Sequence, residues 1–345
     1  DRHWDKTTSP YPTRPWRPFA GHVAAVTLVA KQLLHVRPVL RQRLLDLAPP
    51  SWDEQDVVNA VCFAAAVHDL GKLTVFFQNF VPAAELQGVH TYPTNNLNLP
   101  WNHGNGGYAL FGPGFGGDLQ LFPNNTCPTY LFHAASAHHG VGSHIARDKG
   151  FQKFDQIWKD HPEIRNLDVS AARAFLQDVQ ALFPVQNLSW PTYAYPLHEP
   201  RKAALLKARY FRELVAGIVS VADWRGSDEN TYPLAPTWAP RTFTEWMQDP
   251  NMVEAANASV ACLQPMPAKT LPGASMSIGP HQYSDLQRYV ASLTDYRFLL
   301  VEAPTGDGKT EASFIALMHF LEQKMADGVT FALPVRVAAT LMQQR

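Results

Sequence analysis

Between residues 51 and 262, apolar residues recur at three- and four-residue spacing, and clusters of Gly, Pro and Asn interrupt them. This period places the apolar side chains on one face of each of several helices, so we expect an all-α domain. Ser51 and Glu54 predict a capping box at the start of one helix, which Gly71 is expected to end. Two further helices are predicted over residues 130–139 and 203–224.

Two stretches lack this helical period. Residues 80–125 are rich in Gly, Asn and Pro, which predicts long loops within the domain. From 228 to 280, Pro is frequent and the apolar pattern weakens, so we expect an irregular region that closes the first domain. The resulting prediction is a domain over 1–267 with an irregular part at 228–267, a linker at 268–279 and a second domain at 280–345.

The second domain has a different pattern. An amphipathic helix is predicted near 286–293, followed by a buried strand at 297–302, a Gly-rich turn, a helix over 309–326 and a strand at 329–333. Strands and helices alternate here, so this domain is expected to be α/β. The whole chain is therefore predicted to be an α+β multidomain protein.

Composition sets limits without identifying a function. The chain has 345 residues, of which 46% are hydrophobic and 17% charged, so we expect two globular units. The net charge of −1 means that any binding of nucleic acid must come from local patches. Cys62, Cys127 and Cys262 lie far apart, which argues against a zinc ribbon or a disulfide framework. With no signal region and no run of about 18 uncharged apolar residues, a cytoplasmic protein with no membrane partner is expected.

A phosphate-binding loop is predicted between the strand and the helix of the second domain. Thr305, Gly306 and Gly308 offer backbone amides to phosphates, and the start of the following helix favours an anion. Lys309 is placed to reach the β- and γ-phosphates, and the Thr310 hydroxyl to reach Mg²⁺. The motif predicts ATP with Mg²⁺ as a ligand, and the alternative is a Gly-rich turn that binds no nucleotide.

The loop and its surroundings resemble motifs I and Ia of superfamily 2 helicases, in the segments APTGDGKTEA and ALPVR. This resemblance implies the start of a RecA-like helicase lobe, and places Gln287 where such helicases read adenine. A solvated glutamine is the alternative for Gln287. No Asp-Glu-x-His box follows before Arg345, so we expect an incomplete lobe that binds ATP weakly and does not hydrolyse it.

A set of histidines and aspartates predicts a metal site in the first domain. His68 and Asp69 lie at a predicted helix end with Lys72 nearby, and the other candidates are His22, His103, His138, His139 and Asp223. Imidazoles and a bridging carboxylate suit Mn²⁺, Fe²⁺, Co²⁺ or Ni²⁺ better than Ca²⁺. Two ions about 3.5–4 Å apart can activate water and hydrolyse a phosphodiester. Any one of these histidines alone is more often an ordinary imidazole that binds no metal. Among the histidines left out of the set, His133 is the one with the best chance of being a ligand.

A histidine-aspartate metal domain followed by a helicase motor resembles the CRISPR-associated nuclease-helicases of type I systems, most closely subtype I-E. The matching segments are AAAVHDLGKL, WNHGN, SAHHG, SVADWRGSD and EAPTGDGKTEA. The resemblance implies that Asp69 bridges two ions and that Lys72 neutralises or orients the substrate phosphate. It assigns the first ion to His22, His68, Asp69 and Asp223, and the second to Asp69, His103, His138 and His139.

The same resemblance implies an endonuclease that cuts single-stranded DNA in CRISPR interference and is normally coupled to an ATP-dependent helicase. Its implied partners are single-stranded DNA, the RNA-guided surveillance complex and an inhibitor protein. Two alternatives stay open. One is an HD phosphohydrolase acting on nucleotides, against which the helicase motifs argue. The other is a docking module for the surveillance complex, which would bind its partner without cutting DNA.

Overall fold

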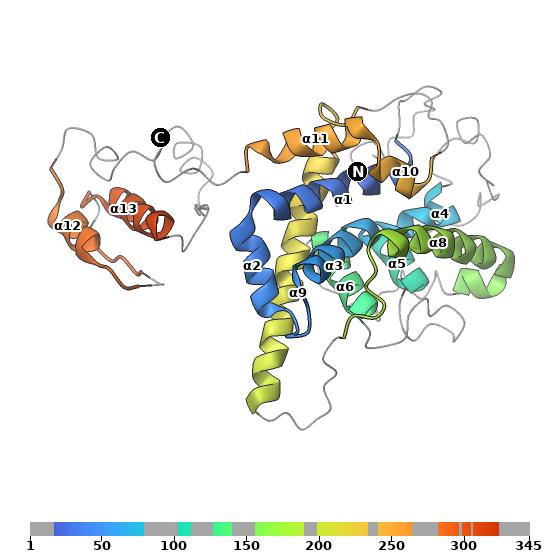
Figure 1. Cartoon of the computed structure of the whole chain (residues 1–345), viewed down its shortest axis with the longest axis horizontal. Coiled ribbons are helices and arrows are strands. Elements are labelled where there is room, and N and C mark those ends of the chain that lie inside the picture. The colour runs from blue at the N-terminus through green and yellow to red at the C-terminus, as the bar shows by residue number, and fades with distance from the viewer. Residues whose placement is uncertain are drawn as a thin grey trace. The chain divides into compact units, whose positions relative to one another are not determined.

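The structure is a computed structural model that describes residues 17–78, 103–111, 127–139, 156–189, 199–233, 241–263, 282–296, 299–304 and 306–323. The chain divides into two units, Asp1–Leu263 and Gln264–Arg345 (Figure 1). Over the described residues of both units, all regular secondary structure is helical.

Three helices form the centre of the first unit (Figure 1). They are α1 (Phe19–Val36), α3 (Glu54–Val67) and α9 (Glu199–Gly226), and each packs against the other two. Their inward faces are apolar and almost completely buried, and they form the middle of the hydrophobic core of the unit. By length and composition α1 could cross a membrane, but 61% of it is buried inside the unit, as expected of a core helix.

The start of α3 differs from the sequence prediction. Its capping box is made by Asp53 and Asp56, each of whose carboxylates accepts the backbone N–H of the other, at 2.8 and 3.0 Å. The box predicted from Ser51 and Glu54 is wrong, because residues 50–51 form a turn in which the Trp52 N–H donates to the Pro49 carbonyl at 3.0 Å. At its other end α3 stops at Val67, and Gly71 lies within the 3-10 turn that follows.

Shorter elements surround the three central helices. They are α2 (Pro38–Leu47), η2 (Leu70–Leu73), α4 (Val75–Gln78), α5 (His103–Phe111), α6 (Cys127–Ala135), η3 (Ser136–His139), α8 (Pro162–Leu182), α10 (Phe243–Met247) and α11 (Pro250–Ala261). The helix predicted over 130–139 corresponds to α6 with η3, and the one over 203–224 to α9.

Two loop predictions are wrong in part. The region 80–125 contains α5, and the irregular region 228–267 contains α10 and α11. Side chains at the helix starts explain the second case, because Thr242 caps α10 in a capping box and Asp249 accepts the N–H of Asn251 at the start of α11. Pro250 stands at the first position of α11, where its missing N–H costs no hydrogen bond.

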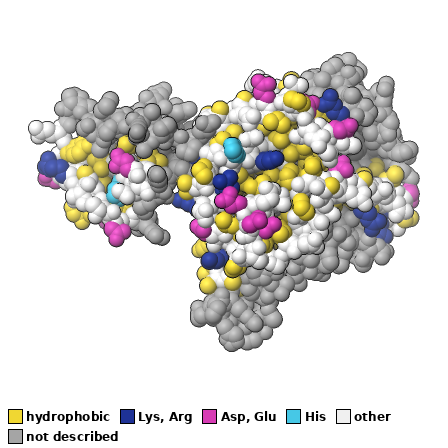
Figure 2. Space-filling model, viewed as in Figure 1, with side chains coloured by type: hydrophobic (Ala, Val, Ile, Leu, Met, Phe, Trp, Pro, Cys, Tyr) yellow, Lys and Arg dark blue, Asp and Glu magenta, His cyan; other side chains and the backbone are white. Residues whose placement is uncertain are grey.

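Figure 2 shows how charge is distributed over one face of the molecule. Over the described residues of this face, acidic and basic side chains are interspersed and do not gather by sign. This distribution agrees with the net charge of −1. Binding of a polyanion must therefore depend on local groups rather than on a broad field.

Asp168 on α8 is a buried carboxyl that secures the turn after the His-Asp pair. It is 1% exposed, and its two oxygens accept the Val75 N–H at 2.7 Å and the Trp158 indole N–H at 2.9 Å. Burial raises the pKa of Asp168 to about 7 even though both donors favour its ionised form. Through Val75, this carboxylate fixes the chain just beyond η2.

We predict that Asp168→Ala lowers the free energy of unfolding by about 2–4 kcal/mol, because two buried donors lose their acceptor. Urea unfolding of the full chain measures this change. Gln177→Ala, at an exposed position of the same helix, is the control and should stay within about 0.5 kcal/mol. An equally small change for Asp168→Ala would contradict the anchoring role.

The described part of the second unit contains α12 (Asp285–Ser292) and α13 (Lys309–Glu322), which pack together over a small core. A buried strand was predicted at 297–302, but residues 299–304 are not a strand and the Leu300 side chain is 78% exposed. A strand requires hydrogen bonds from a neighbouring strand, and the described residues of this unit include no strand that could supply them. The other predicted strand, at 329–333, lies outside the described residues, as do Arg297 and Phe298.

Candidate metal centre

Separate elements bring six predicted ligands together in the first unit. His22 comes from α1, His68 and Asp69 from the end of α3, His103 from the first residue of α5, His138 from η3 and Asp223 from the last turns of α9. The side chains of His68, Asp69, His138 and Asp223 are buried. Because α3 ends at Val67, the His-Asp pair leaves the helix where α1, α5, η3 and α9 converge.

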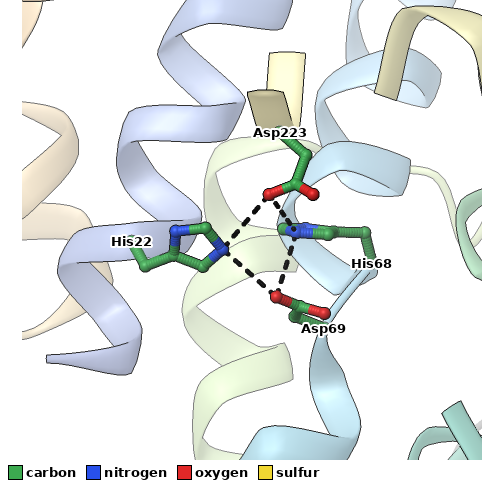
Figure 3. A group of neighbouring side chains, drawn as sticks. All are labelled: His22, His68, Asp69 and Asp223. Carbon is green, nitrogen blue, oxygen red and sulfur yellow. Dashed lines mark hydrogen bonds and ion pairs between the residues drawn. The ribbon is translucent and has the colours of Figure 1, made fainter. Parts of the chain in front are cut away.

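The first group of ligands consists of His22, His68, Asp69 and Asp223 (Figure 3). The His22 Nε2 atom lies 3.1 Å from Asp69 Oδ2 and 3.5 Å from Asp223 Oδ1. The His68 Nε2 atom lies 3.2 and 3.5 Å from the same two oxygens. Two imidazole nitrogens and two carboxylate oxygens thus lie within 4.8 Å of one another, which is a donor set suited to a first-row transition ion.

The second group consists of Asp69, His103 and His138. The Nε2 atoms of His103 and His138 lie 3.2 and 3.8 Å from Asp69 Oδ1. Asp69 therefore turns Oδ2 toward the first group and Oδ1 toward the second, which is the arrangement of a bridging carboxylate. His139 belongs to η3, but its side chain lies outside the described part of the structure.

Backbone carbonyls orient two of the imidazoles. The His68 Nδ1 atom lies 2.7 Å from the Ala65 carbonyl oxygen, and His138 Nδ1 lies 2.6 Å from that of Ala135. A carbonyl only accepts, so Nδ1 carries the proton in both rings and Nε2 is directed at the ligand groups. Metal-bound histidines are typically held in this way by a carbonyl or carboxylate behind the ring.

The charges of the site are arranged around Asp69. Burial disfavours protonation of His68, but Asp69 and Asp223 outweigh burial and raise the pKa of His68 to about 10. Burial also disfavours ionisation of Asp69, yet His68 and Lys72 keep its pKa well below the usual range. The pKa of His22 falls to about 4 because its ring is buried. A proton on His68 thus provides positive charge beside the carboxylates, and a metal ion would displace that proton.

Lys72 is part of this centre. Its Nζ atom lies 2.6 Å from Asp69 Oδ2, and the residue is only 8% exposed, so it is not an ordinary surface lysine.

Two ligand atoms of the centre lack a hydrogen-bond partner within the part of the chain that the structure describes. His68 Nε2 and Asp69 Oδ1 are buried and make no hydrogen bond to any of the described residues. Buried polar atoms of this kind are usually satisfied by a partner such as a water or an ion. An ion held by the first group would coordinate His68 Nε2, and an ion held by the second group would coordinate Asp69 Oδ1, so the residues fit the predicted ions.

Sequence reasoning missed the residues that support the ligands. The Ser220 hydroxyl lies 2.8 Å from the His138 carbonyl oxygen, and the Ser227 hydroxyl donates to Asp223 Oδ1 at 3.1 Å. Both serines lie within one helical turn of Asp223, and that spacing was the available signal. The Arg17 guanidinium donates to the Gly226 carbonyl at 2.6 Å, which ties the start of α1 to the end of α9.

His133 joins neither ligand group among the described residues. Burial lowers the pKa of its imidazole, and its ring lies beside that of Phe132. It is therefore a half-buried, neutral histidine, which is the ordinary case that the sequence allowed.

Two glycines of the predicted phosphate-binding loop have a left-handed backbone conformation. Gly306 and Gly308 have φ angles of 98° and 78°, which side chains other than glycine rarely adopt. The Lys309 Nζ atom donates to the carbonyls of Ala303 and Pro304 at 2.6 and 2.7 Å. Lys309 and Thr310 form the first turn of α13, and Thr305 lies outside the described residues.

Gln287 contacts this loop directly. It is 5% exposed, its amide oxygen accepts the Ser284 N–H at 2.9 Å, and its amide nitrogen donates to the Gly308 carbonyl at 3.3 Å. The alternative of a solvated glutamine is therefore wrong. Gln287 and Ser284 together join α12 to the loop, since the Ser284 hydroxyl also donates to the Asp307 carbonyl at 3.2 Å.

The sequence of the chain is similar to proteins of a known family. Residues 4–232 match the family model of the Cas3 HD domain. The CRISPR-associated endonuclease/helicase Cas3 of Escherichia coli strain K12 is 35% identical over 144 residues, which are 38% of this chain and 15% of that protein.

Solved structures show the same fold. T. fusca Cas3 is 20% identical and has a TM-score of 0.58, and the match covers 98% of this chain and 36% of the T. fusca chain. A CRISPR-associated protein is 20% identical and has a TM-score of 0.51, and the match covers 90% of this chain and 33% of that protein's chain. The chain thus spans about a third of the length of these solved relatives, and at this identity the likeness concerns the fold alone.

Proposed function

The chain belongs to the family of Cas3 HD domains, and from this premise we propose that it is a metal-dependent endonuclease that cuts single-stranded DNA in CRISPR interference. The observation that carries the proposal is the pair of ligand groups that share Asp69. Two ions, when bound, activate a water and offset the charge of the scissile phosphate and of the leaving oxygen. No protein nucleophile is required for this reaction.

The residues have separate tasks in this proposal. Asp69 holds both ions, His22, His68 and Asp223 complete the first site, and His103, His138 and His139 complete the second. Lys72 balances the charge of Asp69 and is placed to orient a substrate phosphate. The five histidines favour Mn²⁺, Fe²⁺, Co²⁺ or Ni²⁺ over Ca²⁺, which prefers oxygen ligands.

The exposed face of α9 supports a nucleic-acid strand as the substrate. Trp224 follows Asp223 directly and is 74% exposed, while Tyr210 and Leu206, four and five turns earlier on the same face, are 55% and 50% exposed. The exposed side chains of Lys202 and Arg209 lie along this face. Aromatic rings stack on unpaired bases and cations bind the backbone, so this face suits a single strand that leads to the metal centre.

We predict that Trp224→Ala raises the KM for single-stranded DNA about 5-fold to 150-fold, because the loss of one stacked base costs about 1–3 kcal/mol. Hydrolysis of bis(p-nitrophenyl) phosphate, which is too small to reach the strand-binding face, should be unchanged. Steady-state kinetics on both substrates provide the measurement, with Tyr289→Ala, a 64% exposed aromatic of the second unit, as the control. An unchanged KM for DNA would remove this face from the substrate path.

We also propose that 1–267 is the nuclease domain, 268–279 a linker and 280–345 the start of a RecA-like helicase lobe. ATP with Mg²⁺ would bind there through Thr305, Gly306, Gly308, Lys309 and Thr310, and the contact of Gln287 with Gly308 supports its inclusion in the site. We propose recruitment by an RNA-guided type I surveillance complex in the cytoplasm, for which the family match is the support, and control by an inhibitor protein. Nucleotide hydrolysis without DNA cutting would favour a phosphohydrolase. Partner binding without any hydrolysis would favour a docking module.

A further inference from the structure

Gly71 lies where η2 and α5 touch so closely that a side chain does not fit. A Cβ atom at Gly71 would lie 1.8 Å from the His103 carbonyl oxygen and 2.5 Å from the Gly107 backbone nitrogen. Gly106 and Gly107 face the same contact, since their own Cβ atoms would lie 3.3 and 3.4 Å from backbone atoms of Gly71. The φ of Gly71 lies outside the left-handed range, so glycine is needed here for space alone.

This contact determines where His103 lies. His103 is the first residue of α5, its carbonyl oxygen touches Gly71, and its ring reaches Asp69 Oδ1 at 3.2 Å. Among the described elements, α5 packs chiefly against η2 and less against α8. A displacement of α5 from η2 therefore moves His103 away from Asp69.

The first ligand group does not depend on this contact. Its members come from α1, from the end of α3 and from α9, which pack on one another through the buried core. The three atoms nearest to a Cβ at Gly71 belong to His103 and Gly107, and none belongs to His22, His68, Asp69 or Asp223. The two groups share Asp69 but are positioned by different packing contacts.

We propose that Gly71 is the positioning residue of the second metal site: its missing side chain docks α5 and so places His103, while the first site forms without this contact. The inference rests on the two-metal function proposed above. Real Cβ atoms essentially never approach another heavy atom within 3.0 Å, so Gly71→Ala displaces the His103 backbone by roughly 1 Å. Metal–ligand distances tolerate only about ±0.2 Å.

The test is to count metal ions bound to the full chain and to its Gly71→Ala variant. Apo protein is titrated with Mn²⁺ or Co²⁺ by calorimetry, and bound metal is measured by elemental analysis after gel filtration. The unchanged chain should bind two ions, and the variant should keep the first while binding the second at least about 10–100-fold more weakly. His103→Ala, which removes the ligand but not the backbone contact, should give the same count.

Gly217→Ala is the matched control, because a Cβ at Gly217 on α9 would meet nothing within 4 Å. It should bind two ions as the unchanged chain does. Circular dichroism melting establishes that each variant is folded. If Gly71→Ala does not fold, the milder Gly106→Ala replaces it, since its Cβ would contact Gly71 at 3.3 Å, and it should weaken only the second ion.

Two results would overturn the proposal. Two ions of unchanged affinity in a folded Gly71→Ala chain would show that the contact does not place His103. Loss of both ions in that folded chain would show that the sites are not positioned independently. Fewer than two ions in the unchanged chain would instead count against the two-metal function itself, so the two failures are distinguishable.

Discussion

Replacing Asp69 by alanine is expected to remove both metal ions and to lower the rate of DNA cleavage by at least about 10³-fold. Asp69 is the one residue common to the two ligand groups of the described structure, with Oδ2 facing His22 and His68 and Oδ1 facing His103 and His138. Elemental analysis of bound metal together with cleavage kinetics measures both effects.

The Asp223→Ala variant is compared with Asp69→Ala, because it should lose one ion where Asp69→Ala loses two. Asp223 contacts only the first group, so its replacement should weaken one ion and leave the other bound. Melting of both variants separates metal loss from unfolding. Retention of two tightly bound ions by a folded Asp69→Ala chain would contradict the bridging role of this carboxylate.

Removal of metal by a chelator should abolish cleavage and lower the melting temperature of the first unit while the unit stays folded. Each ion present at about 1,000 times its Kd stabilises a protein by about 4 kcal/mol, which corresponds to roughly 8–16 °C per ion for a unit of this size. The apo unit stays folded because Lys72 and the protonated His68 offset the buried carboxylates. Scanning fluorimetry with and without EDTA measures the shift.

The same preparation tests which ion the site accepts. Mn²⁺, Fe²⁺, Co²⁺ or Ni²⁺ added back should restore both the melting temperature and cleavage, because imidazole ligands suit these ions. Ca²⁺ serves as the control and should restore neither. Full restoration by Ca²⁺, or a melting temperature insensitive to EDTA, would contradict a histidine-held metal centre.

Several of the residues that the two groups bring together could be selected from the sequence because they stand where apolar helical patterns end. His68 and Asp69 follow an apolar helical pattern that stops there, and Asp223 lies near the end of another. The match to the Cas3 HD domain confirms the family resemblance on which the pairing of ligands was predicted. The distances around Asp69 required the structure, because they depend on how α1, α3 and α9 pack.

Other features could not be predicted because long-range contacts determine them. The helix α5 has the sequence HGNGGYALF, whose glycines predict a loop, and its packing on η2 outweighs their low helix propensity. Gly71 had been interpreted as a helix stop, whereas its close contact with His103 involves a segment more than 30 residues away. In the region 228–267, frequent prolines led to the prediction of an irregular segment, although α11 lies there. Asp249 caps this helix and Pro250 is its first residue.

The measurement that tests the central claim most directly is the cleavage of circular single-stranded DNA by the full chain, with Mn²⁺ and without ATP. A circle has no ends, so linear product arises only by an internal cut. We predict linear product that requires the metal and is absent with Asp69→Ala, while Lys309→Ala, in the other unit, cuts as the unchanged chain does. An intact circle after incubation with a chain shown to hold two ions would contradict the proposed endonuclease and favour the phosphohydrolase or docking alternatives.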